Sequence, residues 1–145
     1  MYKVIVVGTD GSERAGKAVR DAMALAKVSG AELHAVNVVH PAVTIGFNDS
    51  RAQQDQVNTM RDEAEKIRSQ LLADAEAEGV SLKVHNPGGD AAKALLGTAE
   101  NVSADLVVVG NRGMSGMKRF VQGSVPNTVA HSCHCDVLIV DTDTA

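Results

Sequence analysis

Aromatic residues are nearly absent from this chain of 145 residues, which has one Tyr, two Phe and no Trp. Proteins that bind single-stranded nucleic acid stack its bases on aromatic side chains, so this class of function is disfavoured. Hydrophobic residues make up 44% of the chain, and most of them are aliphatic. The core must therefore be built from aliphatic side chains. Such a composition suits buried parallel strands that are covered by alanine-rich helices.

Positive charge, cysteine and long apolar runs are also scarce. The formal net charge is −4, which argues against a nucleic-acid surface because such a surface needs clustered Lys and Arg. The two cysteines, Cys133 and Cys135, are too few for a disulfide framework. No apolar run reaches the roughly 18–20 residues of a membrane span, and the N-terminus has no signal-peptide pattern. We therefore expect a cytoplasmic protein that has neither a membrane nor a nucleic acid as its partner.

Short β-branched runs alternate with segments of helical period along the whole chain. The runs that we predict to be strands are 3–7, 32–39, 80–85, 105–109 and 137–140. Helices are predicted over about 12–29, 57–78 and 91–102, and around Val125 and Val129. This order is β-α-β-α-β-α-β-α-β, without an internal repeat or a linker, and it predicts one α/β domain over residues 1–145. Right-handed crossovers then give a parallel sheet with helices on both faces.

Several local signals bear on the turns between these elements. Ser12 or Asp10 can cap the first helix, Gly30 and Gly79 are placed to end the first and second helices, and Asp90 can cap the third. Residues 40 to about 55 show no sustained period, and we expect a long loop there, which is often functional or mobile. In a parallel sheet the ligand binds beyond the carboxyl ends of the strands. The turns that should lie on this rim contain Thr9, Asp10, Val38, Val39 and Gly110.

The segment from Gly110 to Ser124 carries the strongest functional signal. Gly110 and Gly113 are followed after nine residues by Gly123 and Ser124, directly after a buried strand and at the start of a helix. Backbone amides can converge on a phosphate only where no Cβ blocks the approach, and a helix N-terminus favours an anion. The Ser124 hydroxyl can donate a further hydrogen bond, and Arg112 adds positive charge. These features predict a phosphate-binding loop.

The same spacing resembles the nucleotide signature of the ATP-binding universal stress proteins. The resemblance covers the whole chain, from VIVVGTDGS at the first strand to DVLIV at the last, and ADLVVVGNRG is among its most distinctive stretches. It implies a Rossmann-like sheet of the adenine nucleotide alpha hydrolase-like type, with five parallel strands in the order 3-2-1-4-5. It also implies a homodimer through the last strand, from Val137 to Val140. This pairing has a physical reason, because VLIV would otherwise be an exposed apolar edge.

The resemblance also implies which residues contact the nucleotide. Asp10 resembles the aspartate that lies near the ribose and phosphates, although Asp at such a turn is also a common helix cap. Val38 matches the position whose backbone recognises adenine, and Gly110 resembles the ribose-contacting glycine. Gly113, Gly123, Ser124 and Val125 resemble the phosphate-contacting loop. The full set of expected binding residues is Thr9, Asp10, Val38, Gly110, Arg112, Gly113, Gly123, Ser124 and Val125.

The function that follows is that of a stress-response sensor or adaptor that binds ATP, with or without Mg²⁺. A binding module for AMP or cyclic AMP is one alternative, and a slow ATPase or a phosphoryl- or nucleotidyl-transfer enzyme is another. A dimeric scaffold without nucleotide function is disfavoured because the glycine spacing is intact. The sequence offers no clear general base and no complete Mg²⁺ set beyond Asp10 and Ser124, so we assign no catalytic residue and no metal site.

Two further motifs resemble functional signatures without matching them. Residues 11–18 follow the P-loop pattern except at Ala18, and the helical period places Gly16 and Lys17 inside a helix. Residues 131–135 (HSCHC) resemble a metal-binding sequence, but four ligands within five residues cannot easily surround one tetrahedral ion. We expect both cysteines to pack as small hydrophobes, since no base or motif supports a redox role. His34 is expected to be structural or exposed.

Overall fold

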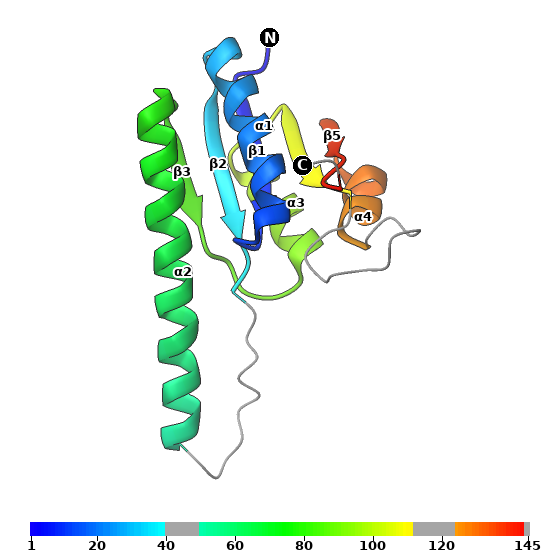
Figure 1. The fold of residues 1–145 in the computed structure, drawn as a ribbon. Coiled ribbons are helices and arrows are strands. Elements are labelled where there is room, and N and C mark those ends of the chain that lie inside the picture. Colours follow the sequence, from blue (N-terminus) through cyan, green and yellow to red (C-terminus); the bar gives the residue numbers. More distant parts are fainter. Residues whose placement is uncertain (40–49, 112–123, 144–145) are drawn as a thin grey trace.

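In the part of the chain that the structure describes, five parallel strands and four helices alternate (Figure 1). The computed structural model describes residues 1–39, 50–111 and 124–143. The strands pair in the order β3-β2-β1-β4-β5, as the resemblance implies, and all of them are parallel, as the alternating sequence pattern predicts. The elements are β1 (Val4–Thr9), α1 (Glu13–Ser29), β2 (Glu32–Asn37), α2 (Ser50–Glu78), β3 (Leu82–His85), α3 (Ala91–Asn101), β4 (Leu106–Gly110), α4 (Ser124–Ser132) and β5 (Asp136–Val140).

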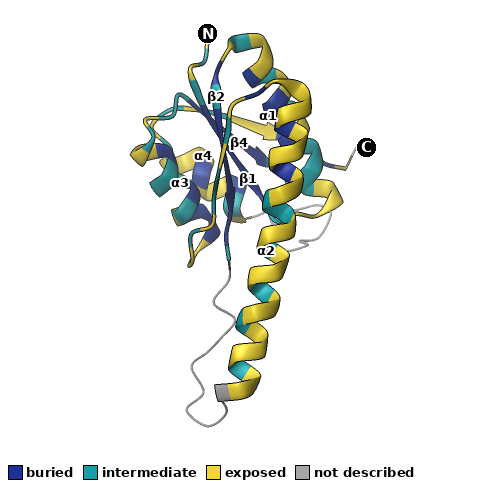
Figure 2. Cartoon of the chain, turned by 90° about the vertical axis from the view of Figure 1, so that its left-hand side faces the viewer, coloured by how far each residue is buried: buried dark blue, intermediate teal, exposed yellow. Residues whose placement is uncertain are grey.

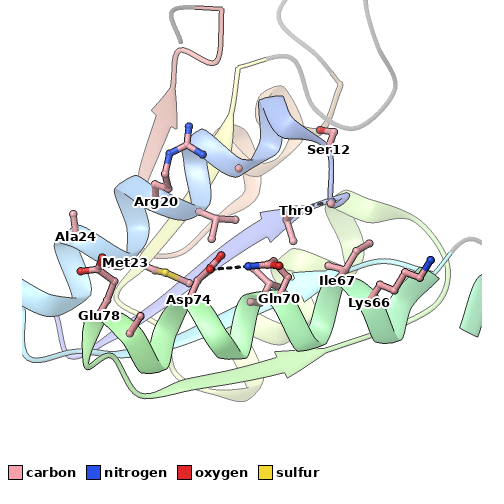
Figure 3. A pocket seen from close by; sticks show the side chains of 15 residues that line it. Thr9, Ser12, Arg20, Met23, Ala24, Lys66, Ile67, Gln70, Asp74 and Glu78 are labelled. Atoms are coloured by element: carbon pink, nitrogen blue, oxygen red, sulfur yellow. Dashed lines mark hydrogen bonds between the residues drawn. The ribbon is translucent and has the colours of Figure 1, made fainter. Parts of the chain in front are cut away.

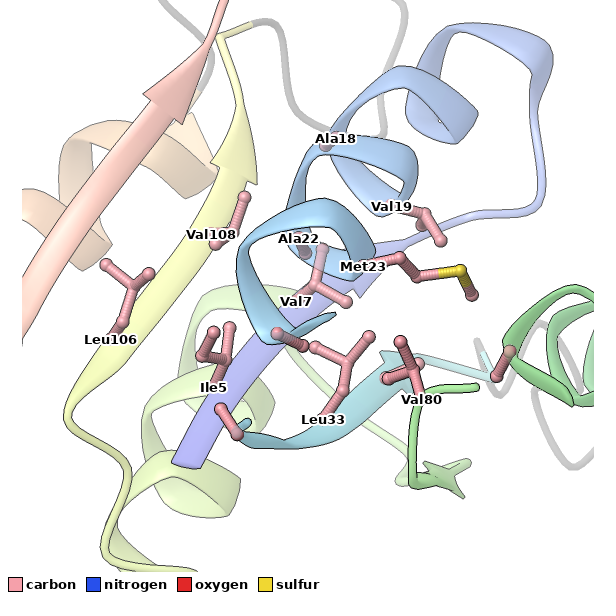
Figure 4. Packing of buried hydrophobic residues seen from close by; sticks show 14 of the residues in the cluster. Ile5, Val7, Ala18, Val19, Ala22, Met23, Leu33, Val80, Leu106 and Val108 are labelled. Carbon is pink, nitrogen blue, oxygen red and sulfur yellow. The ribbon is translucent and has the colours of Figure 1, made fainter. Parts of the chain in front are cut away.

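The central strand β1 is buried on both faces, which explains its continuous run of β-branched residues. Ile5 and Val7 face α1 and α2 in one hydrophobic cluster, which also holds Leu33 and Val108 (Figure 4). Val6 belongs to a second cluster on the opposite face, where α3 and α4 pack. The sheet is therefore the middle of three layers, as the alternating pattern predicts.

The ends of the helices follow local capping chemistry. The Ser12 side chain accepts a hydrogen bond from the Ala15 N–H at 3.1 Å, so Ser12 and not Asp10 caps α1. Gly30 ends α1 in the left-handed conformation, at φ 69°, which glycine adopts without strain. Asp90 caps α3 through the Lys93 N–H, as predicted.

Helix α2 is longer than the sequence predicts, because it begins at Ser50. The expectation of a loop over residues 50–55 is wrong, while residues 40–49 lie outside the described part of the chain. Residues 50–56 are mostly polar but include good helix formers such as Ala52 and Gln53, and a single small apolar residue gives no helical period. This part of α2 extends beyond the sheet, with most of its residues exposed (Figure 2).

Candidate functional site

The switch point of the sheet lies between the carboxyl ends of β1 and β4. From β1 the chain turns to α1 on one face of the sheet, whereas α4, which follows β4 in sequence, packs on the other face. Thr9 ends β1 and pairs in register with Asn37 of β2, and Gly110 ends β4. This is the place where doubly wound sheets bind their ligands.

Two hydrogen bonds from backbone N–H groups to side chains stabilise the turn from β1 to α1. The Thr9 hydroxyl oxygen accepts from the Gly11 N–H at 3.0 Å, and Asp10 Oδ1 accepts from the Ser12 N–H at 2.9 Å. Asp10 therefore stabilises the turn, and this contact uses one of its two carboxylate oxygens. Gly11 has a φ of 79°, and a Cβ at this position would collide with the side chain of Ile67 from α2.

The end of β4 is joined to the segment that follows β5. The Asn111 side chain accepts hydrogen bonds from the Thr142 N–H at 3.1 Å and from the Thr142 hydroxyl at 3.0 Å. A Cβ on Gly110 would lie 2.9 Å from Thr142 Cγ2, so the approach of Thr142 is a structural reason for glycine here. The ribose contact that the resemblance implies would be a second, functional reason for glycine at this position.

A cavity of about 20 Å³ lies at the switch point and brings several expected binding residues together. Thr9, Gly110 and Val125 all line it. Arg14, in the first turn of α1, lines it as well and is exposed. Sequence reasoning missed Arg14, although its place two residues after the helix cap was a usable signal. The cavity has room for about one water molecule, so a nucleotide would lie above it along the rim.

The other expected residues are distributed along the same rim or lie outside the described residues. Ser124 is the exposed first residue of α4. The Val38 side chain is buried in the cluster beneath α3, so a ligand at this position would meet backbone groups. The Val39 N–H donates to the Pro87 carbonyl at 2.9 Å and holds the chain beyond β2 in place. Arg112, Gly113 and Gly123 lie outside the described residues.

A larger groove of about 630 Å³ runs between α1 and α2 and was not predicted from the sequence (Figure 3). It begins at Thr9 and Ser12, beside the β1–α1 turn, and ends near Asp74 and Glu78. Gln70 donates to Asp74 Oδ1 at 2.8 Å along its α2 wall. The groove thus opens onto the switch point at one end.

The segment that resembles a P-loop has a structural role. Gly16 and Lys17 lie inside α1, as the helical period predicts, and Lys17 forms an ion pair with Asp21 at 3.5 Å. In the described part of the chain no group of three or more His, Cys, Asp or Glu side chains is arranged to hold a metal ion. The cysteines are only partly buried, at the edge of the second hydrophobic cluster.

A contact between the buried His34 of β2 and the half-buried His85 of β3 was missed by sequence reasoning. His34 is 4% exposed, and its Nδ1 lies 2.8 Å from Nε2 of His85. Its Nε2 lies 2.9 Å from Glu32, which also pairs with Lys83 at 3.3 Å. Burial, followed by the charges of His34, Lys83 and Arg68, lowers the pKa of His85. His34 lies in the middle of β2, and His85 is the last residue of β3.

Comparison with known proteins agrees with this architecture. The model of the universal stress protein family matches residues 1–141. Universal stress protein YxiE of Bacillus subtilis is 32% identical over 147 residues, which cover 97% of this chain and 99% of that protein. A universal stress protein of Mycobacterium tuberculosis is 34% identical, with 97% of each chain covered.

Solved structures give the same result. A universal stress protein in complex with cAMP is 33% identical, with a TM-score of 0.73 over 97% of this chain and 98% of that one. A universal stress protein of Archaeoglobus fulgidus in complex with dAMP, 23% identical with a TM-score of 0.66 over 95% of this chain and 97% of that one, shares the fold. None of the helices in the described residues is long and apolar enough to cross a membrane. By sequence and by fold, this chain belongs to the universal stress protein family.

Proposed function

We propose that this chain binds an adenine nucleotide, ATP, along the rim that joins the ends of β1, β2 and β4. The observation that carries the proposal is the convergence of Thr9, Gly110 and Val125 at the switch point of the sheet. The related universal stress protein whose structure contains cAMP, at 33% identity, supports the same ligand class.

The polar groups of the rim suit the parts of such a ligand. The exposed Ser124 begins α4, and the helix N-terminus there favours phosphate oxygens. Arg14 adds a cation at the same place, and Arg112, Gly113 and Gly123 would complete the loop. The backbone at Val38 would meet the adenine. Where Mg²⁺ accompanies the phosphates, Asp10 and Ser124 provide the oxygen donors that this ion prefers.

The proposed role is that of a cytoplasmic stress sensor or adaptor that pairs as a homodimer through β5. A nucleotide that binds one conformation better than another shifts the population toward it, and the altered surface is what a partner protein reads. The α1–α2 groove begins at Thr9 and Ser12, beside the rim. A nucleotide that binds at the rim can therefore alter the shape of this groove, and the groove is a surface that a partner protein can contact.

Two alternatives follow from specific observations. Binding of cyclic AMP or AMP is favoured by the relative with cAMP. Slow hydrolysis or group transfer ranks below binding, because the sequence offers no clear general base and one carboxylate oxygen of Asp10 already accepts a hydrogen bond from the Ser12 N–H. ATP turnover that disappears in Asp10→Ala, in protein free of contaminating ATPase, would reverse this ranking.

The test identifies which small molecule is bound to the purified protein and which adenine nucleotide stabilises the protein against thermal unfolding. Mass spectrometry of the small molecules released on denaturation should find an adenine nucleotide. In thermal unfolding, ATP at about 100 times its Kd should add about 2.7 kcal/mol of stability, and AMP and cyclic AMP are compared at the same concentration. Gly113→Asp should abolish the shift. The proposal fails if no adenine nucleotide is released and none raises the unfolding temperature at millimolar concentration.

A further inference from the structure

The two cysteines lie side by side where α4 ends and β5 begins. Cys133 follows the last residue of α4 and its N–H donates to the Val129 carbonyl at 2.9 Å, which holds it on the helix end. Cys135 directly precedes β5. Their Sγ atoms are 3.3 Å apart, and both thiols are free. The single residue between them, His134, is exposed.

Both cysteines are partly buried and line hollows of the molecular surface. A groove of about 400 Å³ between the C-terminal ends of α3 and α4 is lined by Cys133 and Cys135 together with Ala99 and Ser103. A second hollow, beside Tyr2 and Asp136, also reaches Cys135. A small disulfide compound can therefore approach the pair, whereas a fully buried cysteine would be inert.

We propose that Cys133 and Cys135 form a redox modification site, which closes reversibly to an intramolecular disulfide by exchange with a low-molecular-weight disulfide such as glutathione disulfide. A disulfide needs an S–S distance of about 2.05 Å, so the sulfur atoms, which are 3.3 Å apart, must approach by roughly 1.3 Å. Cytosolic disulfides of this kind are usually transient and redox-sensing.

The two cysteines take different parts in the exchange. Burial, followed by the hydrogen bond with Cys133, raises the pKa of Cys135 to about 12, and the nearby Asp136 and Asp105 carboxylates act in the same direction. Cys135 therefore stays protonated at neutral pH, and we assign the first attack to Cys133, whose sulfur lies 3.3 Å away and which lines the same groove. This order is expected because the thiolate is the nucleophile in exchange.

The chemistry balances in two steps. The Cys133 thiolate attacks one sulfur of glutathione disulfide, the S–S bond breaks, and one glutathione thiolate leaves. Cys135 then loses its proton and attacks the Cys133 sulfur, which releases the second glutathione thiolate. Both thiolates take up the protons that the cysteines have lost, so two protein thiols are oxidised and one glutathione disulfide is reduced to two glutathione molecules.

The pair is separated from the proposed nucleotide site. Cys135 precedes the first residue of β5, whereas the rim lies at the opposite end of the parallel strands, where β4 ends at Gly110. We therefore expect the oxidation state of the pair to leave nucleotide affinity largely unchanged. The redox proposal and the nucleotide proposal can then fail independently.

The test uses the reduced, full-length protein. It is equilibrated with an excess of glutathione disulfide, its remaining thiols are blocked by alkylation, and the intact mass is measured. We expect both thiols to disappear together without a glutathione adduct. The tryptic peptide that follows Arg119 holds both cysteines and should be lighter by two hydrogens. Two free thiols, one adduct on each cysteine, or a disulfide between two chains would overturn the proposal.

Single variants test the order of attack. Cys135→Ser should trap glutathione on Cys133 at about the rate at which the wild-type protein reacts. Cys133→Ser should collect it on Cys135 severalfold more slowly, because burial, the largest cause of the raised pKa of Cys135, remains in this variant. Equal rates in the two variants would contradict the assigned order. Because the peptide measurement uses the wild-type chain, the disulfide itself can be tested even if a variant folds poorly.

Discussion

The side chain of Ile67 in α2 occupies the space where Gly11, in the β1–α1 turn, would carry a Cβ. Gly11 also has a positive φ, so glycine is favoured here both by backbone conformation and by close packing. The contact links the middle of α2 to the turn that holds Thr9 and Asp10. Packing by α2 thus helps to set the shape of the proposed nucleotide rim.

We predict that Gly11→Ala destabilises the protein by about 2–4 kcal/mol, from left-handed strain and from the collision with Ile67. Gly30→Ala is the matched control: Gly30 has φ 69° with nothing within 4 Å of its would-be Cβ, and we expect a loss of only about 1 kcal/mol. Urea unfolding of both variants measures the difference. Equal losses would show that Ile67 does not constrain this turn.

The histidine pair predicts a specific dependence of stability on pH. Because the folded protein lowers the pKa of His85, the unfolded chain binds more protons once the pH falls below about 6.5. The free energy of unfolding should therefore be highest above this pH and decrease from pH 7.5 to 5.5. The lowered pKa of Glu32, due first to its hydrogen bond with Lys83, acts below about pH 4.5 and outside this window.

We expect His85→Gln to flatten this decrease, because the variant removes one of the two stacked rings and its proton. His131→Gln, at an exposed position in α4, should keep the wild-type slope. Thermal unfolding at intervals of pH measures both variants. A slope that is unchanged in His85→Gln would assign the pH dependence to other groups.

Asp105 ties the start of β1 to the start of β4. Its two carboxylate oxygens accept from the Lys3 N–H at 2.9 Å and from the Val4 N–H at 3.1 Å. Burial alone would raise the pKa of Asp105, but these backbone hydrogen bonds outweigh it and the pKa is lowered.

We predict that Asp105→Asn, which keeps one acceptor oxygen, lowers the free energy of unfolding by about 1–2 kcal/mol at pH 7. The carboxylate stabilises the fold above its ordinary pKa of about 3.8, and this contribution is lost as the pH falls through the lower, folded value. The variant and the wild type should therefore converge in strong acid. Asp62→Asn, at an exposed position of α2, is the control and should have little effect.

The β5 edge predicts how the proposed homodimer can be disrupted. Leu138 and Ile139 are each 36% exposed on this edge strand. A lysine on an apolar edge strand opposes pairing with a second chain, so Ile139→Lys should shift the protein toward the monomer in analytical ultracentrifugation. Val28→Lys, at a position in α1 that is 74% exposed, should leave the oligomeric state unchanged. A monomeric wild-type protein would contradict pairing through β5.

The fold could be predicted from the sequence where one residue pattern determines one structure. Buried parallel strands need continuous β-branched runs such as that of β1, and helix ends need caps such as Ser12, Gly30 and Asp90, so both features are local and readable. The resemblance supplied the strand order, which the structure confirms. The positions of Arg112, Gly113 and Gly123 lie outside the described residues, and their contribution stays a prediction.

The features that sequence reasoning missed depend on contacts between distant residues. His34 and His85 meet only because β2 and β3 pair in a register that places His34 beside Lys83. The collision between Gly11 and Ile67, and the α1–α2 groove, depend on how two helices pack. The early start of α2 is a different case, since polar helix formers leave no hydrophobic period to detect.

Calorimetric titration with ATP tests the central claim most directly. The wild-type protein should bind one nucleotide per chain. Gly123→Asp should abolish binding, because the added side chain and its carboxylate would block the approach of the phosphate to the backbone amides. Gly97→Asp in α3, where nothing lies within 4 Å of the would-be Cβ, should bind as the wild type does. Undetectable binding by the wild type at millimolar ATP, or unchanged affinity in Gly123→Asp, would contradict the account.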